Sequence, residues 1–349
     1  MRRIDTLDGA RGLAALIVCL GHFFIDVAGA PRDGWGFYAA SFTGSASVGL
    51  FFILSGFVIP ANLERVSYRT FIIRRLLRIY PVVIVAALVK FAILLHYSAL
   101  SLNEEALQLL AGAMSLFGNA FFWNEKGIEP IFWTLAIEVK FYILAVLVFL
   151  LARRRKEHFF PCLLGLLLGI GALAHHLPVP IRPWISDLGV LVSTLPMLVL
   201  GWCGWLWYSG QISRWSLILG ACSVALALSM TPYPIYVSWS RGAPSWMLAA
   251  VLFLAILMQP RFFTLLSGRA GHFLGQISFP LYAIHPAMLW VMQDLRTGVV
   301  AVDLPVFLAL TLAASWLIHQ LFEAPAIEFS KRLTSRPALP QAIQPVPVG

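Results

Sequence analysis

Apolar stretches about as long as a membrane is thick recur along this chain. A helix needs roughly 20 mostly apolar residues to cross the hydrocarbon core of a bilayer. Ten stretches approach that length: residues 9–29, 43–60, 79–98, 132–152, 159–176, 188–208, 215–231, 245–259, 272–294 and 303–322. Charged residues make up 12% of the chain, against about 25% in soluble domains. The sequence excludes a water-soluble globular protein and predicts an all-α, polytopic membrane bundle of about ten transmembrane helices.

The distribution of positive charge predicts the orientation of the bundle. Residues 106–123 are also apolar, and counting them as a crossing would put the basic cluster at 153–156 outside. If they do not cross and the N-terminus is cytoplasmic, 17 of the 25 Lys and Arg lie in cytoplasmic segments, five lie outside and three lie within spans. Cytoplasmic loops carry such an excess. We therefore expect residues 106–123 to form an outer re-entrant or interfacial helix, and both termini to be cytoplasmic.

The rest of the composition favours one domain. No internal repeat and no linker long enough to separate two domains is evident, and the Pro-rich residues 336–349 are expected to be a disordered cytoplasmic tail. The net charge of +9 is attributed to charge sorting across the membrane, so no nucleic-acid partner is expected. The four cysteines are interpreted as small buried apolar residues, without disulfide or metal-binding spacing: Cys19, Cys162, Cys203 and Cys222.

The first span contains two ionisable residues on one face. An ionisable side chain inside a span costs a few kcal/mol, so it needs a partner or a function. Arg11 and His22 are eleven residues apart, which puts them within about 20° of each other on a helix, roughly 16 Å apart along its axis. Arg11, near the cytoplasmic mouth, can hold an anion, and His22, deeper in the membrane, can accept a proton. Alternatively, Arg11 reaches lipid headgroups and His22 makes an interhelical hydrogen bond. Asp26 either orients the His22 imidazole or is solvated at the outer end.

A carboxylate lies near the outer end of the fourth span. Lys140 is two residues from Glu138 and points to another side of the helix, so it does not neutralise Glu138 locally. Glu138 therefore has three possible environments: a partner from another helix, a substrate hydroxyl, or outer water.

A basic turn precedes the third span. Arg74, Arg75 and Arg78 lie at the predicted cytoplasmic surface, where such clusters usually set topology and bind anionic lipid. The same side chains suit a ligand that carries several phosphates.

Two prolines interrupt the ninth span. Pro280 and Pro286 each remove a helix hydrogen bond, so Ser278 and His285 are expected to satisfy the freed carbonyl groups. The same structural role is expected of His319 in the tenth span.

Six sequence elements occur in the order typical of one enzyme family. They are Leu7-Asp8 with Arg11, ten residues and His22; Phe51-Phe52 with Ser55-Gly56-Phe57; Arg75 with Arg78-Ile79 and Pro81; Trp133-Thr134-Leu135 with Glu138 and Phe141-Tyr142; Leu274 to His285; and Glu323 with Pro325. Over roughly residues 5–335 the chain resembles the acyltransferase 3 family of integral-membrane O-acyltransferases, which acylate surface polysaccharides, lipopolysaccharide, Nod factors and some macrolides. It differs at Gly49, where many members carry an acid, and a one-domain enzyme is expected, without a periplasmic hydrolase-like domain after the tenth span.

The resemblance implies an activity and a set of site residues. Residues 1–335 are expected to form one acyltransferase domain in the bacterial inner membrane. It would transfer an acyl group, expected to be acetyl from acetyl-CoA reached from the cytoplasm, to a hydroxyl of a carbohydrate or lipid-linked glycan. The expected residues are His22 as general base or transient acyl carrier and Glu138 orienting the acceptor from the outer side; Arg11, Arg75, Arg78 and Tyr80 for the CoA donor; and Asp26, Ser55 and Trp133 for the acceptor, with no metal.

Two other classes of protein remain open on the sequence. A secondary transporter also uses about ten spans with buried charges, although the inverted repeats common in transporters are not evident. A non-catalytic lipid-binding or assembly scaffold is the third possibility, and it predicts that neutralising His22 has no effect.

Overall fold

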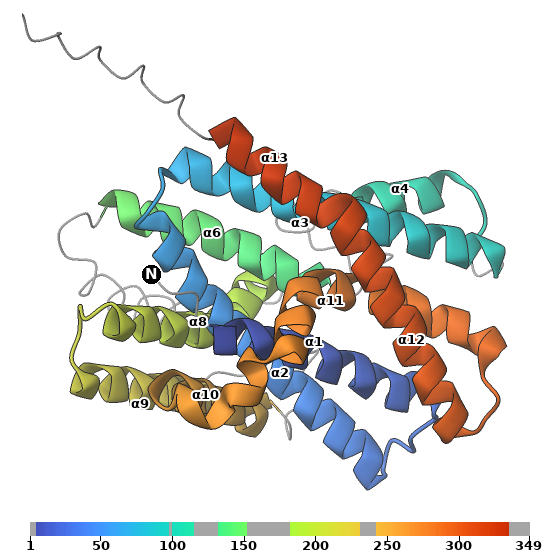
Figure 1. Ribbon diagram of the computed structural model, residues 1–349, viewed down its shortest axis with the longest axis horizontal. Coiled ribbons are helices and arrows are strands. Elements are labelled where there is room, and N and C mark those ends of the chain that lie inside the picture. Colours follow the sequence, from blue (N-terminus) through green and yellow to red (C-terminus); the bar gives the residue numbers. More distant parts are fainter. Residues whose placement is uncertain (1–4, 98–99, 115–131, 152–181, 231–241, 335–349) are drawn as a thin grey trace, which may run out of the picture.

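The computed structural model describes residues 5–97, 100–114, 132–151, 182–230 and 242–334 (Figure 1). Every regular element within these ranges is a helix. The elements are α1 Asp5–His22, η1 Phe23–Val27, α2 Trp35–Leu63, α3 Tyr68–His96, α4 Glu104–Met114, α6 Trp133–Leu151, α8 Arg182–Tyr208, α9 Arg214–Met230, α10 Gly242–Met258, η4 Pro260–Ser267, α11 Arg269–Leu295, α12 Val300–Ile318, η5 His319–Glu323 and α13 Ala324–Thr334. The all-α prediction is confirmed.

Helices cover nine of the ten predicted spans. The remaining predicted span, at 159–176, lies outside the described residues. Within those residues, five helices are long and apolar enough to cross a membrane: α1 with η1, α2, α3, α6, and α12 with η5 and α13. A sixth is added if α10 and η4, bent by 97°, count as one broken span. A membrane-embedded helical protein is thus supported, and the number ten stays a prediction.

The described part of the predicted non-crossing segment is the helix α4. The backbone N–H of Ala106 donates to the side chain of Asn103 over 2.8 Å, which caps the start of the helix. α4 packs against α3. Residues 115–123 lie outside the described ranges, so the expectation that residues 106–123 do not cross stays a prediction.

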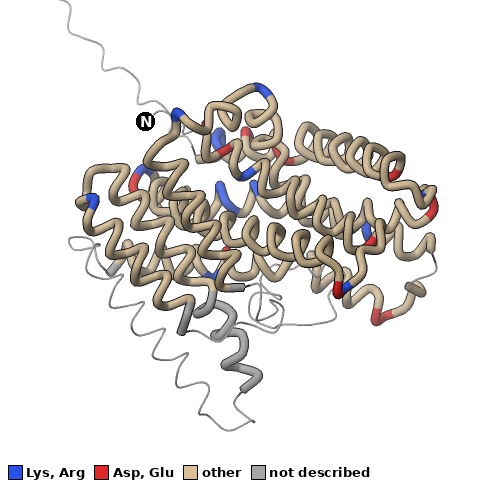
Figure 2. Tube along the Cα trace, turned by 90° about the horizontal axis from the view of Figure 1, so that it is seen from below, with Lys and Arg blue, Asp and Glu red and all other residues tan. Residues whose placement is uncertain are grey.

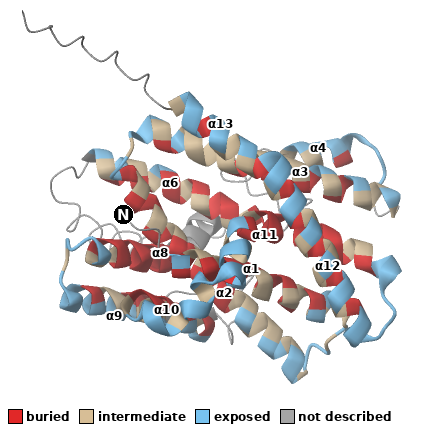
Figure 3. Ribbon diagram, in the orientation of Figure 1, coloured by how far each residue is buried: buried red, intermediate tan, exposed pale blue. Residues whose placement is uncertain are grey.

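α1 lies at the centre of the bundle and packs mainly against α11 and α2 (Figure 1). α2 in turn contacts α8 and α10, and α11 contacts α12 and α3. Buried residues are dense on α8 and α11 (Figure 3), whereas large apolar side chains such as Leu147, Leu226 and Val251 are exposed. Most of the described trace carries no charged residue (Figure 2). An apolar exterior with few charges fits lipid as the surrounding solvent.

Glycines allow the central helices to cross closely. A Cβ atom on Gly12 of α1 would overlap the backbone of Leu274 in α11, and one on Gly275 would lie 2.7 Å from the backbone oxygen of Asp8. Gly56 of α2 and Gly201 of α8 form a similar crossing. Small residues at such contacts let helix backbones approach each other in a membrane. The Arg-Gly and Ser-Gly-Phe elements of the sequence therefore have a packing role besides any chemistry.

The expectation that the cysteines are buried is only partly correct. Cys19 is buried and Cys203 is half-buried, but Cys222 on α9 is exposed, and Cys162 lies outside the described residues. Among the described helices, α9 packs mainly against α8 and α10. An apolar stretch indicates that a residue is in the membrane layer, but not whether it faces protein or lipid.

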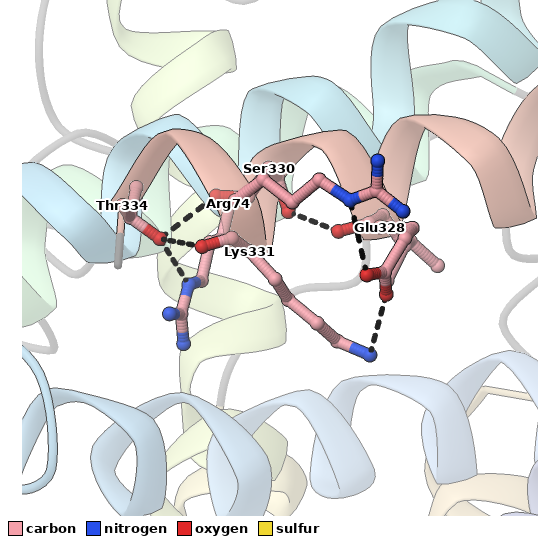
Figure 4. A network of polar contacts seen from close by, with 7 residues as sticks. Arg74, Glu328, Ser330, Lys331 and Thr334 are labelled. Atoms are coloured by element: carbon pink, nitrogen blue, oxygen red, sulfur yellow. Dashed lines mark hydrogen bonds and ion pairs between the residues drawn. The ribbon is translucent and has the colours of Figure 1, made fainter. Parts of the chain in front are cut away.

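α13 lies along α3 near the C-terminal end of the described chain (Figures 1 and 4). The Arg74 Nε donates to the Thr334 hydroxyl over 2.9 Å, and that hydroxyl donates to the Ser330 carbonyl over 2.8 Å. On the exposed face of α13, Glu328 pairs with Lys331 and Arg332. Arg74 thus holds α13 against α3, a role that the sequence of the basic turn does not indicate.

Candidate active site

A cavity of about 90 Å³ lies between α1, α2, α3, α6 and α11. This space is large enough for several water molecules or a small organic group. Its polar lining comes from five helices far apart in sequence: Arg11, Ser55, Arg75, Arg78, Thr134, Glu138, Tyr142, Ser278 and Tyr282. The apolar lining includes Phe51, Phe52 and Phe279. The site therefore exists only once the bundle has formed.

The cavity combines three arginines with one carboxylate. Arg11, Arg75 and Arg78 line it together with Glu138. Glu138 is close enough to Arg11 and Arg78 to attract both charges. The lining is thus positive overall, in a region of the protein where few charges are found. The sequence prediction put the arginines at the cytoplasmic mouth and Glu138 on the outer side, whereas the structure brings all four to one cavity.

Two hydroxyl groups hold the Glu138 carboxylate. Tyr142, one turn later on α6, donates to Glu138 Oε1 over 2.5 Å, and Ser55 of α2 donates to the same oxygen over 3.2 Å. Of the three environments considered for Glu138, the structure shows the first, a partner from another helix. The second carboxylate oxygen makes no hydrogen bond among those recorded between described residues, and it belongs to a side chain that lines the cavity.

Arg75 and Arg78 are held in different ways. The Arg75 guanidinium lies over the rings of Phe71 and Tyr142, 5.4 and 5.6 Å from their centroids. The Arg78 Nε lies 3.4 Å from Glu323 Oε1, and the other oxygen of Glu323 lies 2.8 Å from His319 Nδ1. Glu323 is 1% exposed. His319 therefore pairs with a carboxylate and not with a freed backbone carbonyl, which corrects the sequence expectation.

Glu323→Ala is expected to destabilise the protein strongly. Removing one partner of a buried ion pair leaves uncompensated charge and costs about 3–5 kcal/mol. The melting temperature in detergent, measured by a fluorescence thermal shift, should fall by several degrees. The matched control is Glu328→Ala, since Glu328 is 53% exposed and exposed pairs contribute about 0–1 kcal/mol. Equal melting temperatures for the two variants would contradict a structural role for the Arg78–Glu323 pair.

The prolines of α11 organise the polar groups around them. Pro286 has no N–H to donate to the carbonyl of Tyr282, four residues earlier, and His285 Nδ1 lies 2.8 Å from that oxygen. The prediction for His285 is thus confirmed. Ser278 donates to the Gly275 carbonyl over 3.0 Å, and not to the Gln276 carbonyl that Pro280 frees. The Tyr282 hydroxyl lies 3.1 Å from Thr134 Oγ1, which joins α11 to α6 at the cavity.

His22 lies next to the cavity but not in its lining. Its ring centroid is 5.3 Å from that of His285, which is 5.8 Å from that of the cavity residue Tyr282. His22 Nδ1 lies 3.3 Å from Asp26 Oδ2, and the two side chains are 44% and 49% exposed. Asp26 thus contacts the imidazole, which is the first of the two alternatives considered for Asp26. Arg11 and His22 lie on the same helix, but only Arg11 lines the cavity. The rings of His285 and Tyr282 lie between His22 and the cavity.

Five of the predicted site residues line this cavity, which we call the arginine cavity: Glu138, Arg11, Ser55, Arg75 and Arg78. Tyr80 and Trp133 are not in its lining and pack against the apolar core, Trp133 with its ring 6.0 Å from that of Phe52. Their neighbours Ile79 and Thr134 take those places in the cavity. A helix moves by about 100° per residue, so a motif identifies a region better than it identifies which side chain faces inward.

Sequence reasoning assigned no role to Tyr142, Tyr282 or Glu323, although all three were part of matched elements. Tyr142 follows Glu138 by four residues and Glu323 follows His319 by four, a spacing that brings side chains together on a helix, so these two contacts could have been predicted. The contacts that Tyr282 and Glu323 make with other helices join segments far apart in the sequence, and no local pattern indicates them.

A known protein family matches most of the chain. A family model described as the acyltransferase domain, acyltransferase 3, matches residues 4–320, nearly the whole chain. No curated protein and no solved structure matches the chain. The matched region includes every residue of the arginine cavity and also His22, Asp26 and His285. This membrane-embedded chain therefore belongs to the acyltransferase 3 family.

Proposed function

We propose that the protein is a membrane O-acyltransferase that moves an acetyl group from acetyl-CoA to a hydroxyl of a carbohydrate or lipid-linked glycan, in the inner membrane of a bacterium. The observation that supports it best is the cavity in which three arginines meet one carboxylate, within a chain of an acyltransferase family. A secondary transporter is not favoured by that family.

The arginines suit the donor. CoA carries several phosphate groups, and the planar guanidinium binds phosphate oxygens through paired hydrogen bonds. Arg75 is fixed by two aromatic rings and Arg78 by Glu323, so little side-chain entropy is lost when an anion binds. Glu138 limits the repulsion between the guanidinium groups of Arg11 and Arg78. In this proposal the three arginines hold the phosphate groups of the donor.

His22 supplies the base in this proposal. A sugar hydroxyl is a poor nucleophile, and a positioned histidine that removes its proton typically accelerates transfer about 10²- to 10⁴-fold. As the O–H bond breaks, the oxygen attacks the thioester carbonyl, and the C–S bond then breaks with its electron pair on sulfur. The thiolate takes the proton back from the imidazole. Asp26 stabilises the imidazolium, and Glu138 orients the hydroxyl or the thioester through its cavity-facing carboxylate.

The proposed activity is tested by following both products. The full-length protein in nanodiscs is mixed with acetyl-CoA and a bacterial glycan acceptor. Free CoA thiol is then measured with a thiol reagent, and acetylated glycan is measured by mass spectrometry. We expect one thiol released per acetyl group transferred, and release that depends on the acceptor. Counterflow of glycan in liposomes with no thiol release would instead identify a transporter and overturn the proposal.

Arg11→Met is expected to weaken donor binding. A hydrogen bond to a charged group contributes about 1.5–3 kcal/mol, which corresponds to a rise of roughly 10- to 100-fold in KM for acetyl-CoA. The KM for the glycan should stay the same. The matched control is Arg269→Met, because Arg269 is exposed at the start of α11 and outside the cavity lining. An unchanged KM for acetyl-CoA in Arg11→Met would exclude this arginine from the donor site.

A further inference from the structure

Tyr142 contacts both kinds of charge in the arginine cavity. Its hydroxyl donates to Glu138 Oε1 over 2.5 Å, and the guanidinium of Arg75 lies over its ring, 5.6 Å from the centroid. The side chain is 7% exposed. The carboxylate is thus bound at the edge of the ring and the cation over its face. A phenylalanine would fill the same space and still attract the cation, so the hydroxyl calls for an explanation beyond packing.

Arg75 and Glu138 both line the cavity, yet no ion pair between them is recorded among the described residues. The recorded contacts of Arg75 are with the rings of Phe71 and Tyr142. Those of Glu138 are hydrogen bonds from the hydroxyls of Tyr142 and Ser55. Opposite charges attract more strongly inside a protein than in water. The two charges are therefore held apart by the partners that each of them has.

These partners leave the polar atoms of both charges available. A ring attracts a cation through its face and has no oxygen that would accept the guanidinium N–H groups of Arg75. Tyr142 and Ser55 both donate to Oε1 of Glu138 and not to Oε2. A direct ion pair between Arg75 and Glu138 would instead occupy the N–H groups through which a guanidinium binds phosphate. The arrangement around Tyr142 is thus the one that keeps Arg75 open to an anion.

We propose that Tyr142 is a positioning residue that keeps the Glu138 carboxylate from pairing with Arg75, so that Arg75 stays open to the phosphate groups of the donor. Without the hydroxyl, the carboxylate loses its shortest hydrogen bond and turns to the guanidinium. The donor must then displace an internal anion before it can bind. The inference rests on the proposed function and deepens it, since it names the contact that keeps the donor site from closing on itself.

Binding of CoA to the full-length protein in nanodiscs, measured by isothermal titration calorimetry, tests this inference. Tyr142→Phe keeps the ring beside Arg75 and removes only the hydroxyl. We expect the Kd for CoA to rise roughly 10- to 100-fold, the effect of losing a hydrogen bond to a charged group. The melting temperature should change little, because the ring still packs against Phe71. The matched control is Tyr208→Phe, which removes a hydroxyl outside the cavity lining and should leave the Kd unchanged.

Two neutral backgrounds separate positioning from packing. In Glu138→Gln and in Glu138→Met no carboxylate is present to compete with the donor. Adding Tyr142→Phe to either variant should therefore change the Kd for CoA by less than about threefold. A double-mutant cycle of this kind isolates the interaction between two residues in contact. If Tyr142 acted only through packing, the hydroxyl would contribute the same factor with and without the carboxylate.

Equal factors in the wild-type and the neutral backgrounds would overturn the inference. A Kd for Tyr142→Phe within about twofold of the wild-type value would do the same. The wild type also serves as the test of the donor itself. If it binds no CoA, the proposed function fails; if it binds CoA and Tyr142→Phe binds it equally well, only the role of Tyr142 is rejected.

Discussion

His22→Ala is expected to reduce kcat for acetyl transfer by about 10²- to 10⁴-fold, the usual contribution of a general base. The substitution removes the imidazole ring that pairs with Asp26. It leaves the arginine cavity intact, since His22 is not in its lining. The KM for acetyl-CoA should therefore stay close to that of the wild type. Release of CoA thiol, measured at saturating donor and acceptor, gives kcat directly.

His272→Ala is the matched control for this substitution. His272 is an exposed histidine on α11 whose ring contacts only Gln276 among the recorded hydrogen bonds, so its kcat should equal that of the wild type. Both variants should melt at the same temperature, because the His22 side chain is itself 44% exposed. Acetyl transfer at the wild-type rate by folded His22→Ala would reject the base assignment, and with it the role of Asp26 in stabilising the imidazolium.

Gly56→Leu is expected to prevent α2 and α8 from packing. A Cβ atom on Gly56 would overlap the carbonyl oxygen of Leu198 and lie 2.7 Å from its carbonyl carbon. Both are backbone atoms, so the helices must separate and the reciprocal contact at Gly201 opens with them. Overpacking of a core by added methylene groups costs about 1–3 kcal/mol and sometimes more, and a backbone clash belongs at the upper end. We expect little or no monodisperse protein after detergent extraction.

Gly44→Leu makes the same change on the same helix without the clash. A Cβ atom at Gly44 meets no atom of the described residues within 4 Å, so this variant should express and melt like the wild type. Size-exclusion chromatography of detergent-solubilised protein compares the two. A monodisperse Gly56→Leu protein with the wild-type melting temperature would show that α2 and α8 do not meet as closely as the structure places them. Because Gly56 also adjoins Ser55 in the cavity lining, any protein recovered should be inactive.

The membrane class and the helical architecture could be predicted from the sequence because both depend on local properties. The length and hydropathy of each apolar stretch are sufficient to identify a helix, and nine of the ten predicted spans coincide with helices in the described residues. The His285 bond to Tyr282 was predictable for the same reason, since Pro286 frees a carbonyl four residues away. The contact of Glu138 with Tyr142 also lies within one turn.

Two features were not predictable in this way. One is the exposed position of Cys222. The other is that the cavity is lined by Ile79 and Thr134 and not by their neighbours Tyr80 and Trp133. Each depends on which face of a helix meets another helix. In an apolar helix, faces that contact lipid and faces that contact protein have similar compositions, so the pattern of one segment does not distinguish them.

The sequence by itself determined that this chain is a helical membrane protein of the acyltransferase 3 family. It also indicated five candidate site residues, Arg11, His22, Arg75, Arg78 and Glu138. Only the tertiary structure decided that Glu138 shares a cavity with the three arginines, that Glu323 holds Arg78, and that His22 lies against His285. The physical reason is separation along the chain: these contacts join residues up to 263 positions apart, and they form only when the helices pack together, as α1 and α11 do through the close crossing at Gly12 and Gly275.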